Sequence, residues 1–332
     1  MVDIYRTTYD EKGAGHYVAP RLAYAYLNIG LHDASRQIVD ELMKESPNDW
    51  RTWFLHWWLR GTEEQDRKSR RVNSSPHQPR PTMISPALTH RVFPTAEAAS
   101  EALADEIAEL IRSRAAEGRQ VVLGLATGST PIRLYAALVH LHRQGLSFAN
   151  VVTFNLDEYL GIERSHEESY WNFMHFSLFD HIDVPPENIH IPPGTTPDEE
   201  LDAACAAYEN AIREAGGIDL QVLGIGHNGH IGFNEPSSPP NTRTRVMQLN
   251  ERTIRDAANA FGGAENVPKR AITMGVGTIL DARRIVLLAF GESKAGIVQR
   301  ALTEEISANL PATYLQNHPD VTLYLDQAAA PR

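Results

Sequence analysis

The sequence IDLQVLGIGHNGHIGFNEP, residues 218–236, changes character halfway along. Its first half is an apolar run through Leu220, Val222, Leu223 and Ile225, which predicts a strand buried on both faces. The second half cannot continue that strand, because four glycines, at positions 224, 226, 229 and 232, favour no single conformation. Polar residues lie between and beyond these glycines: His227, Asn228, His230, Asn234 and Glu235. A buried strand followed by such a loop is typical of the edge where an open α/β sheet carries its chemistry.

Three interpretations of this loop are open. A polar turn would need only one or two special residues, and this stretch has more. A metal site from His227, His230 and Glu235 would lack the third firm ligand and the helical spacing that zinc sites usually show. The third interpretation is general acid–base chemistry by an imidazole that polar neighbours hold in place. Histidine suits this role because its side chain changes charge near neutral pH. We expect this third interpretation and no bound metal.

Strand and helix patterns alternate outward from this stretch, from about residue 87 to the C-terminus. Thr95 is the expected N-cap of the first helix, and Ser165 with Glu168 is the expected capping box of a helix at 170–179. Further apolar strands are expected at residues 120–125, 151–154, 285–290 and 321–325. This alternation predicts an α/β fold, a three-layer Rossmann-like arrangement of a mostly parallel sheet with helices on both faces.

A second candidate site is the loop after the strand at 120–125. It consists of Thr127, Gly128, Ser129 and Thr130, followed by Pro131 at the start of a helix. Free backbone N–H groups and hydroxyls at such a turn suit a phosphate. The loop is not a Walker loop, because no Gly-Lys-Ser/Thr follows, and Ser and Thr are also ordinary N-caps.

Asp157 and Glu158 form a third candidate site, at the carboxyl end of the strand at 151–154. Adjacent acids are costly to desolvate unless something uses them. A carboxylate in this place could move a proton between neighbouring carbons of a sugar, whereas the alternative is a helix cap or a surface turn.

Lys294 is the fourth candidate, in the first turn of a helix expected from Ser293. A cation is unfavourable at that end of a helix by about 0.3–1 kcal/mol. Either its long side chain reaches water, or a bound anion offsets the conflict. In the second case, Lys294 and the loop at 127–130 would bind one phosphate from two sides.

The first 60 residues differ from the rest of the chain. Residues 19–49 resemble one tetratricopeptide helix pair. The residues near the repeat's usual apolar, small, turn and closing-proline positions are Leu22, Ala23, Tyr26, Gly30, Leu42 and Pro47. A further helix with an aromatic face is expected from about Asn48, on Trp50, Trp53, Trp57 and Trp58. One repeat cannot bury its own face. We therefore expect a small helical cap with no function of its own. The alternatives are that it docks on the main domain, pairs with another chain, or is the remnant of a longer array.

Residues 61–86 are expected to be a linker, since prolines at 76, 79, 81 and 86 sustain neither helix nor sheet. Its basic cluster, Arg67, Lys68, Arg70 and Arg71, is short and is interpreted as solvated. The expected organisation is a helical segment at 1–60, this linker, and a catalytic domain at 87–332.

Composition limits the classes of function. The chain has 332 residues and a net charge of −11, which argues against nonspecific binding of nucleic acid. A single cysteine, Cys205, excludes internal disulfides and suits a reducing compartment. No run reaches membrane-spanning length, and the N-terminus lacks the pattern of a secretory signal. We expect a cytoplasmic protein with no nucleic-acid or membrane partner.

Several long stretches between about residues 90 and 326 carry a specific resemblance. They read LGLATGSTPIRLYAALV, VVTFNLDEYLGI, SYWNFMHFSLFDHI, LGIGHNGHIGFNEP, NTRTR, VPKRAITMGVGTILDA and FGESKAG. In content and order they resemble the glucosamine-6-phosphate deaminase (glucosamine-6-phosphate isomerase) family. The related phosphogluconolactonases share the fold and a similar glycine loop, but GHIGFNEP resembles the deaminase signature.

The resemblance implies a reaction and a set of roles. Glucosamine 6-phosphate and water would give fructose 6-phosphate and ammonia, with no cofactor. Asp157 resembles the base that moves a proton from C2 to C1, and His230 with Glu235 resembles the group that opens the sugar ring. Thr127, Gly128, Ser129, Thr130 and Lys294 match phosphate-binding positions. The expected partner is therefore a small phosphosugar; a homo-oligomer is left open.

Three departures from the family pattern accompany these matches. Asn228 stands where many members have an aspartate, and its carbonyl is expected to accept a hydrogen bond from His230. Asn259 stands where family members have an arginine on the mobile segment that closes over the phosphate. Arg255 is a candidate replacement for that arginine. Met247 stands where an allosteric lysine is expected, although Ser238 and Arg245 match; allosteric activation is therefore not expected to follow from the resemblance alone.

Two other classes of function stay open at this point. One is a non-catalytic sugar-phosphate sensor that signals through its N-terminal helices. The other is a related isomerase or lactonase of another phosphosugar. The first would bind a phosphosugar without turnover, and a panel of substrates would separate the second from a deaminase.

Overall fold

The computed structural model describes residues 6, 18–28, 31–45, 51–52, 54–56, 58–59 and 88–331. The chain divides into two compact units, Met1–Ile84 and Ser85–Arg332. The expected linker at 61–86 and the aromatic residues Trp50, Trp53 and Trp57 lie outside the described residues.

The first unit contains a pair of packed helices, α2 (Val18–Asn28) and α3 (His32–Glu45). The Ser35 hydroxyl donates a 2.8 Å hydrogen bond to the Ala23 carbonyl and ties the two together. Residues 51–52, 54–56 and 58–59 are also helical, and Trp58 meets Tyr24 edge-on with ring centroids 6.3 Å apart. Helices therefore occupy the expected positions. The likeness to a tetratricopeptide repeat stays a prediction, since Gly30 and Pro47 lie outside the described residues.

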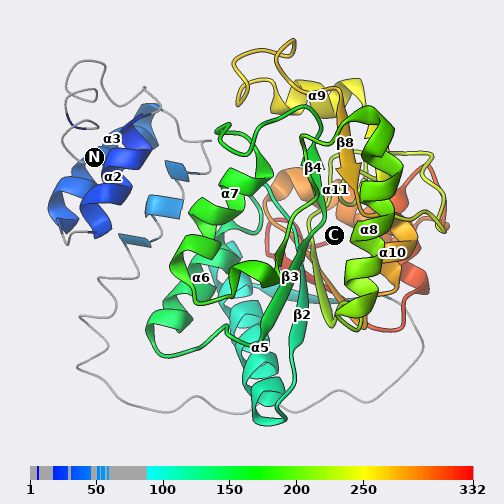
Figure 1. Ribbon diagram of the computed structural model, residues 1–332, viewed down its shortest axis with the longest axis horizontal. Coiled ribbons are helices and arrows are strands. Elements are labelled where there is room, and N and C mark those ends of the chain that lie inside the picture. Colours follow the sequence, from blue (N-terminus) through cyan, green and yellow to red (C-terminus); the bar gives the residue numbers. More distant parts are fainter. Residues whose placement is uncertain are drawn as a thin grey trace. The chain divides into compact units, whose positions relative to one another are not determined.

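The second unit is built on a seven-stranded sheet in the order β1-β10-β9-β6-β2-β3-β5 (Figure 1). Every pair of neighbouring strands is parallel, which confirms the predicted sheet. The strands are β1 (Thr89–Phe93), β2 (Val121–Leu125), β3 (Val151–Asn155), β5 (Ile189–His190), β6 (Leu220–Leu223), β9 (Arg284–Ala289) and β10 (Val321–Asp326).

Helices cover both faces of this sheet, and Figure 1 shows α5 and α6 on one side of β2 and β3 with α8 on the other. Thr95 caps α5 as predicted, because its side chain accepts from the Ala98 N–H. The α-helices of this unit are α5 (Ala96–Ala116), α6 (Ile132–Arg143), α7 (Tyr170–Ser177), α8 (Leu201–Glu214), α9 (Glu251–Ala257), α10 (Val276–Leu280) and α11 (Glu292–Thr303). Short 3-10 helices occur at Phe179–His181, Pro186–Asn188, Asp198–Glu200 and Pro311–Asn317.

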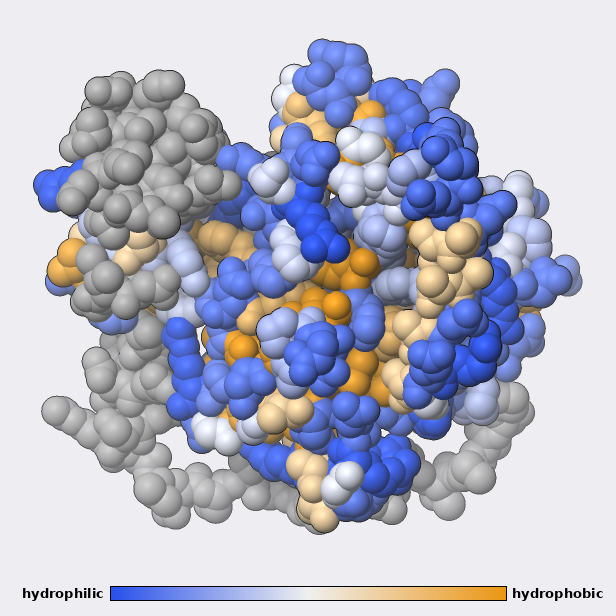
Figure 2. Space-filling view, viewed as in Figure 1, coloured by the Kyte–Doolittle hydropathy of each residue, from blue (hydrophilic) through white to orange (hydrophobic). Residues whose placement is uncertain are grey.

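The core lies where these layers meet. All residues of β2, β3 and β6 are buried, as expected of strands with helices on both faces. In the view of Figure 2, hydrophilic side chains cover most of the surface around a hydrophobic strip near its middle. None of the described helices combines the length and apolar character that crossing a bilayer needs.

A second, three-stranded antiparallel sheet was not predicted. It consists of β4 (Asp157–Tyr159), β8 (Arg270–Thr273) and β7 (Arg245–Gln248) in the order β4-β8-β7. These segments have only three or four residues, too few for an alternating pattern to stand out. Its consequence for the site is that β4 continues directly from β3 and holds Asp157 in a fixed strand.

The predicted capping box of α7 was wrong. The N-cap is Ser169, whose hydroxyl oxygen accepts from the Asn172 N–H at 3.0 Å. Ser165 lies in the turns at 164–168, before this cap, whereas the helix itself begins at Tyr170, as predicted.

Candidate active site

The carboxyl ends of β2, β3 and β6 meet at one edge of the sheet, and a cavity of about 340 Å³ lies there. Loops after these strands, together with α9 and α11, form its walls. The sequence-predicted residues that line it are Thr127, Gly128, Ser129, Thr130, Asp157, His230 and Lys294. From these predicted residues the fold brings together the Asp157 carboxylate, the His230 imidazole, the Lys294 ammonium and the hydroxyl loop.

The loop at 127–130 joins β2 to α6. Gly128 has φ +96°, a left-handed conformation that a side chain would strain. Pro131 directly precedes the first residue of α6 and carries no N–H of its own. The loop backbone is thus bent over the cavity at the start of a helix, an arrangement suited to an anion.

Lys294 lies in the first turn of α11, as predicted, although the helix begins at Glu292, one residue before the expected start. Its Nζ donates a 2.7 Å hydrogen bond to the Ile225 carbonyl, which lies just beyond β6. Burial lowers the pKa of Lys294, while the charge of Asp256 opposes that shift. The side chain therefore does not run out to water but lines the same cavity as the hydroxyl loop.

Asp157 is almost completely buried, with 5% of its surface exposed. Burial, followed by the neighbouring charge of Glu158, raises the pKa of Asp157 to about 8, against opposing hydrogen bonds from the Phe233 N–H and the Thr273 side chain. Gly232 is close as well, since an added Cβ there would lie 3.2 Å from Asp157 Oδ2. A carboxyl with a pKa near neutrality is suited to take up and return a proton.

Glu158 points elsewhere, because successive residues of a strand face opposite sides. Its carboxylate accepts from the N–H groups of Tyr159 at 2.9 Å, Tyr170 at 3.0 Å and Trp171 at 2.9 Å. Burial raises its pKa to about 7 against those three donors. Both expectations for the acidic pair therefore apply, one to each residue: Asp157 faces the cavity, and Glu158 caps the start of α7.

His230 faces the carboxylate of Glu235, with Nδ1 3.6 Å from Oε2. Desolvation raises the pKa of Glu235, but the nearby His230 ring and hydrogen bonds from Thr253 and Asn228 outweigh it and bring the pKa to about 2. Glu235 is thus a fixed negative charge behind the ring. An added Cβ at Gly226 would lie 2.3 Å from the His230 ring, so the ring packs directly on that glycine.

Asn228 acts differently from the expectation. Its side-chain N–H donates to Glu235 Oε2 at 2.7 Å, and its carbonyl accepts from the main-chain N–H of His230 at 3.2 Å, not from the ring. The amide therefore orients the carboxylate and shapes the loop. Among the described residues, no group of three or more His, Cys, Asp or Glu side chains is placed to hold a metal ion.

Several residues of the cavity wall had no assigned role in the sequence analysis. Thr253 and Asp256 come from α9, a seven-residue helix without a motif, and Tyr159 and Tyr170 come from β4 and α7. His227 had been considered only as a metal ligand. Its Nδ1 lies 3.6 Å from Asp256 Oδ2, a contact between loop and helix that no sequence spacing indicates.

Asn259, which stands in place of the family's arginine, and Arg255, its candidate replacement, both lie outside the cavity wall. Asn259 is exposed in the turns after α9, and Arg255 is paired with Glu251 at 3.5 Å on the outer side of that helix. Arg255 therefore does not replace the arginine in this conformation. Arg245 donates to Asn234 at 2.8 Å and to Ser238 at 3.2 Å, and so braces the loop that carries Glu235.

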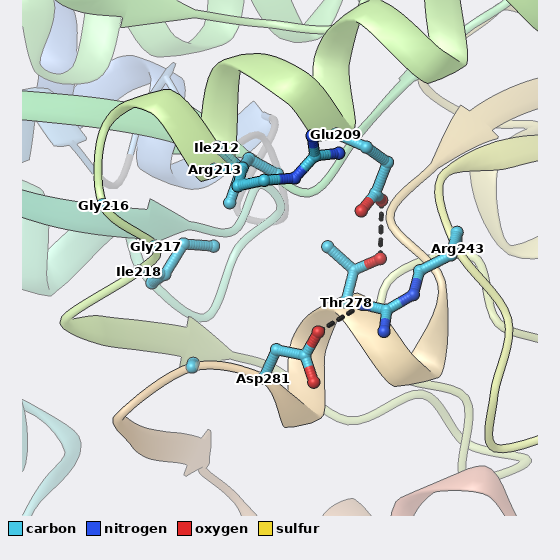
Figure 3. A pocket seen from close by; sticks show the side chains of 10 residues that line it. Glu209, Ile212, Arg213, Gly216, Gly217, Ile218, Arg243, Thr278 and Asp281 are labelled. Atoms are coloured by element: carbon cyan, nitrogen blue, oxygen red, sulfur yellow. Dashed lines mark hydrogen bonds and ion pairs between the residues drawn. The ribbon is translucent and has the colours of Figure 1, made fainter.

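A larger cavity, of about 510 Å³, lies beside the start of β6 (Figure 3). Its charged groups already have partners: Arg243 pairs with Asp281, and Glu209 accepts from the hydroxyls of Thr244 at 2.5 Å and Thr278 at 2.6 Å. Arg213 donates to the side-chain oxygen of Asn210 at 2.8 Å. It contains no residue that the sequence analysis had singled out. We therefore place the chemistry in the smaller cavity.

Comparison with known proteins agrees with this geometry. The family described as glucosamine-6-phosphate isomerases/6-phosphogluconolactonase matches residues 94–324. The glucosamine-6-phosphate deaminase of Thermoanaerobacter pseudethanolicus is 47% identical over 231 residues, which cover 69% of this chain and 90% of that protein. The glucosamine-6-phosphate deaminase of Rhodopirellula baltica is 50% identical over 240 residues, 72% of this chain and 93% of that protein.

Solved structures give the same picture. A monomeric glucosamine-6-phosphate deaminase has 42% sequence identity and a TM-score of 0.70, covering 73% of this chain and 98% of that one. A 6-phosphogluconolactonase from Trypanosoma brucei, at 21% identity and a TM-score of 0.61, covers 74% of this chain and 98% of that one, and shares the fold.

Proposed function

This chain belongs to the glucosamine-6-phosphate isomerase/6-phosphogluconolactonase family, and from that premise we propose that it is a glucosamine-6-phosphate deaminase. The reaction is glucosamine 6-phosphate plus water to fructose 6-phosphate plus ammonia. The observation that carries the proposal is that Asp157 and His230 line one cavity with the hydroxyl loop and Lys294.

The phosphate end of the substrate lies between the loop at 127–130 and Lys294. N–H groups and hydroxyls of the loop donate to the phosphate oxygens, and the ammonium offsets part of their charge. Holding the phosphate fixes the sugar ring across the cavity, so that its reacting carbons come near Asp157 and its ring oxygen near His230.

Ring opening comes first and falls to His230. The imidazole, backed by the Glu235 carboxylate, delivers a proton to the ring oxygen as the bond between C1 and that oxygen breaks. The C1 hydroxyl gives its proton to water and becomes the aldehyde. The fixed negative charge of Glu235 stabilises the protonated ring of His230.

Proton transfer between the carbons falls to Asp157. Its carboxylate removes the C2 proton, the electron pair forms the C1–C2 double bond, and the aldehyde oxygen takes a proton from water, which gives an enolamine. The protonated Asp157 then returns a proton to C1, leaving an imine at C2. Water adds to that imine, ammonia leaves, and the ketone of fructose 6-phosphate remains. Every atom comes from the sugar and water, so no cofactor takes part.

The experiment uses the purified full chain and measures ammonia release from two amino-sugar phosphates and hydrolysis of one phosphosugar lactone. Glucosamine 6-phosphate is expected to give ammonia, N-acetylglucosamine 6-phosphate is expected to give none, and 6-phosphogluconolactone is expected to be hydrolysed no faster than in buffer. Tight binding of glucosamine 6-phosphate without ammonia at high protein concentration would reject the proposal in favour of a sensor. Fast lactone hydrolysis would reject it in favour of a lactonase.

For the rest of the chain we propose a helical N-terminal segment at 1–60, a linker at 61–86, and the deaminase domain at 87–332. The location we propose is the cytoplasm, and a homo-oligomer is one assembly that sizing of the purified protein would test.

A further inference from the structure

The phosphate end of the cavity has little positive charge. Among the described residues that line it, Lys294 is the only lysine or arginine, and its Nζ already donates to the Ile225 carbonyl at 2.7 Å. A phosphate monoester carries a charge of about −1.5 to −2 at pH 7. One ammonium therefore offsets only part of the charge that the substrate brings.

His227 is placed to supply the rest. It lines the same cavity as Lys294 and the loop at 127–130. Its side chain is 43% exposed, and its Nδ1 lies 3.6 Å from Asp256 Oδ2. Nδ1 thus faces the carboxylate, and within the described part of the chain no group forms a hydrogen bond with Nε2. One ring nitrogen thus faces a carboxylate of the protein, and the other is left for a ligand.

The charges around His227 come from two helices. Lys294 of α11, then burial, lower the pKa of His227, and Arg252 of α9 adds to that; Asp256 of α9 raises it. Arg252 lies on the far side of Asp256, with its Nε 3.8 Å from Oδ1, and does not line the cavity. In the empty cavity the ammonium disfavours a protonated ring. An anion placed between Lys294 and His227 reverses that effect, since it attracts both cations.

We propose, on the premise of the proposed function, that His227 binds the substrate's phosphate through Nε2 as an imidazolium, while Asp256 holds the ring from the Nδ1 side. His227 is then a binding residue of the deaminase, and Asp256 is a positioning residue that acts through it. Binding of the phosphosugar takes up a proton on His227.

The sign of the pH dependence follows. The imidazolium contributes affinity at pH values below the pKa of His227 in the complex, and this contribution is lost as the pH rises through that value. The ester itself loses charge below its second pKa of about 6. His227 therefore strengthens binding most between about pH 6 and neutrality, and adds nothing at pH 9.

The test is calorimetry of fructose 6-phosphate binding to the full chain at pH 6.5 and pH 8.5, in pairs of buffers with different ionisation enthalpies. No turnover is needed. We expect His227→Asn to weaken binding about tenfold at pH 6.5, and much less at pH 8.5. We also expect wild type to take up more protons on binding than the variant at pH 6.5. His90→Asn, an exposed histidine outside the cavity, is the matched control and is expected to bind like wild type.

A double variant distinguishes loss of a phosphate ligand from a second effect, the repulsion between the phosphate and an Asp256 carboxylate that has lost its partner. His227→Asn alone leaves the Asp256 carboxylate unpaired near the phosphate, which would weaken binding even if His227 were no ligand. Under the proposal, His227→Asn with Asp256→Asn stays weaker than wild type and shows no extra proton uptake. Recovery of wild-type affinity in the double variant would overturn the proposal, as would equal proton uptake by wild type and His227→Asn.

The experiments distinguish failure of the deaminase assignment from failure of the role of His227. If the protein releases no ammonia but fructose 6-phosphate and inorganic phosphate bind with the expected pattern, only the deaminase assignment fails. If ammonia is released at a normal rate and His227→Asn binds both probes like wild type at pH 6.5, only the role of His227 fails.

Discussion

His230 Nδ1 lies 3.6 Å from Glu235 Oε2, and this carboxylate is itself held by the side chains of Asn228 and Thr253. Because Asn228 is neutral, Glu235 supplies the only charge in this cluster that can stabilise a protonated His230. Asn228, which departs from the family pattern, therefore orients the Glu235 carboxylate, and that carboxylate stabilises the His230 imidazole.

The first prediction concerns Glu235→Gln. The amide keeps the size of the side chain but removes the charge behind His230, so ring opening slows and kcat falls by about 100-fold. KM changes little, since Glu235 is not placed among the phosphate ligands. Steady-state kinetics of ammonia release measure both. Thr253→Val removes one donor to the same carboxylate and is expected to lose less activity. An unchanged kcat in Glu235→Gln would contradict this role.

The second prediction concerns Asp157→Asn and stability. Because burial and then Glu158 raise the pKa of Asp157 from its ordinary value of 3.8 to about 8, the folded protein binds a proton that the unfolded chain releases between those values. Stability from this group is present below pH 3.8 and falls as the pH rises to about 8. Asp157→Asn removes that penalty, so Tm at pH 8.5 should rise by an amount equivalent to about 1–3 kcal/mol. If Asp157→Asn had a lower Tm than wild type at pH 8.5, the Asp157 carboxyl would not be the destabilising group described here.

The third prediction concerns Glu158→Gln. Loss of the neighbouring charge lowers the pKa of Asp157, so the acid limb of kcat/KM against pH moves to lower pH. One N–H at the start of α7 loses its acceptor, which destabilises the fold by about 1–3 kcal/mol. Glu163→Gln, on the exposed turn before α7, is the control and is expected to change neither quantity. An unshifted acid limb would indicate that the two carboxyls do not interact.

The fourth prediction concerns Gly226→Ala. The new Cβ would lie 2.3 Å from the His230 ring, so the ring must leave its position. Activity is expected to fall by about 100-fold while the protein stays folded. Gly296→Ala in α11, where nothing lies within 4 Å, is the matched control; it is expected to keep full activity and gain about 0.5–1 kcal/mol of stability. Equal activity of the two variants would exclude the packing of His230 on Gly226.

The sequence was sufficient for features that local pattern determines. Buried runs such as those of β2 and β6 and the loops that follow them were predictable, because the carboxyl ends of parallel strands meet at one edge. This placed Thr127, Asp157, His230 and Lys294 in one site before any contact was known.

Long-range contacts were not predictable in this way. The pairing of β4 with β8 joins segments more than a hundred residues apart, and the contact of His227 with Asp256 joins a loop to a helix that has no motif. The different roles of Asp157 and Glu158 depend on β4 being a strand, which three residues cannot indicate by themselves. In each case tertiary structure, and not local preference, decides which side chain faces the cavity.

The most direct test of the account follows hydrogen exchange at C1 of fructose 6-phosphate, incubated with ammonium ions in deuterated water and observed by NMR. Wild type should exchange one C1 hydrogen for deuterium, because Asp157 removes it and returns one from solvent. Asp157→Asn should bind fructose 6-phosphate and show no exchange. Exchange at the wild-type rate in Asp157→Asn would show that another group moves the proton, and would contradict the central claim.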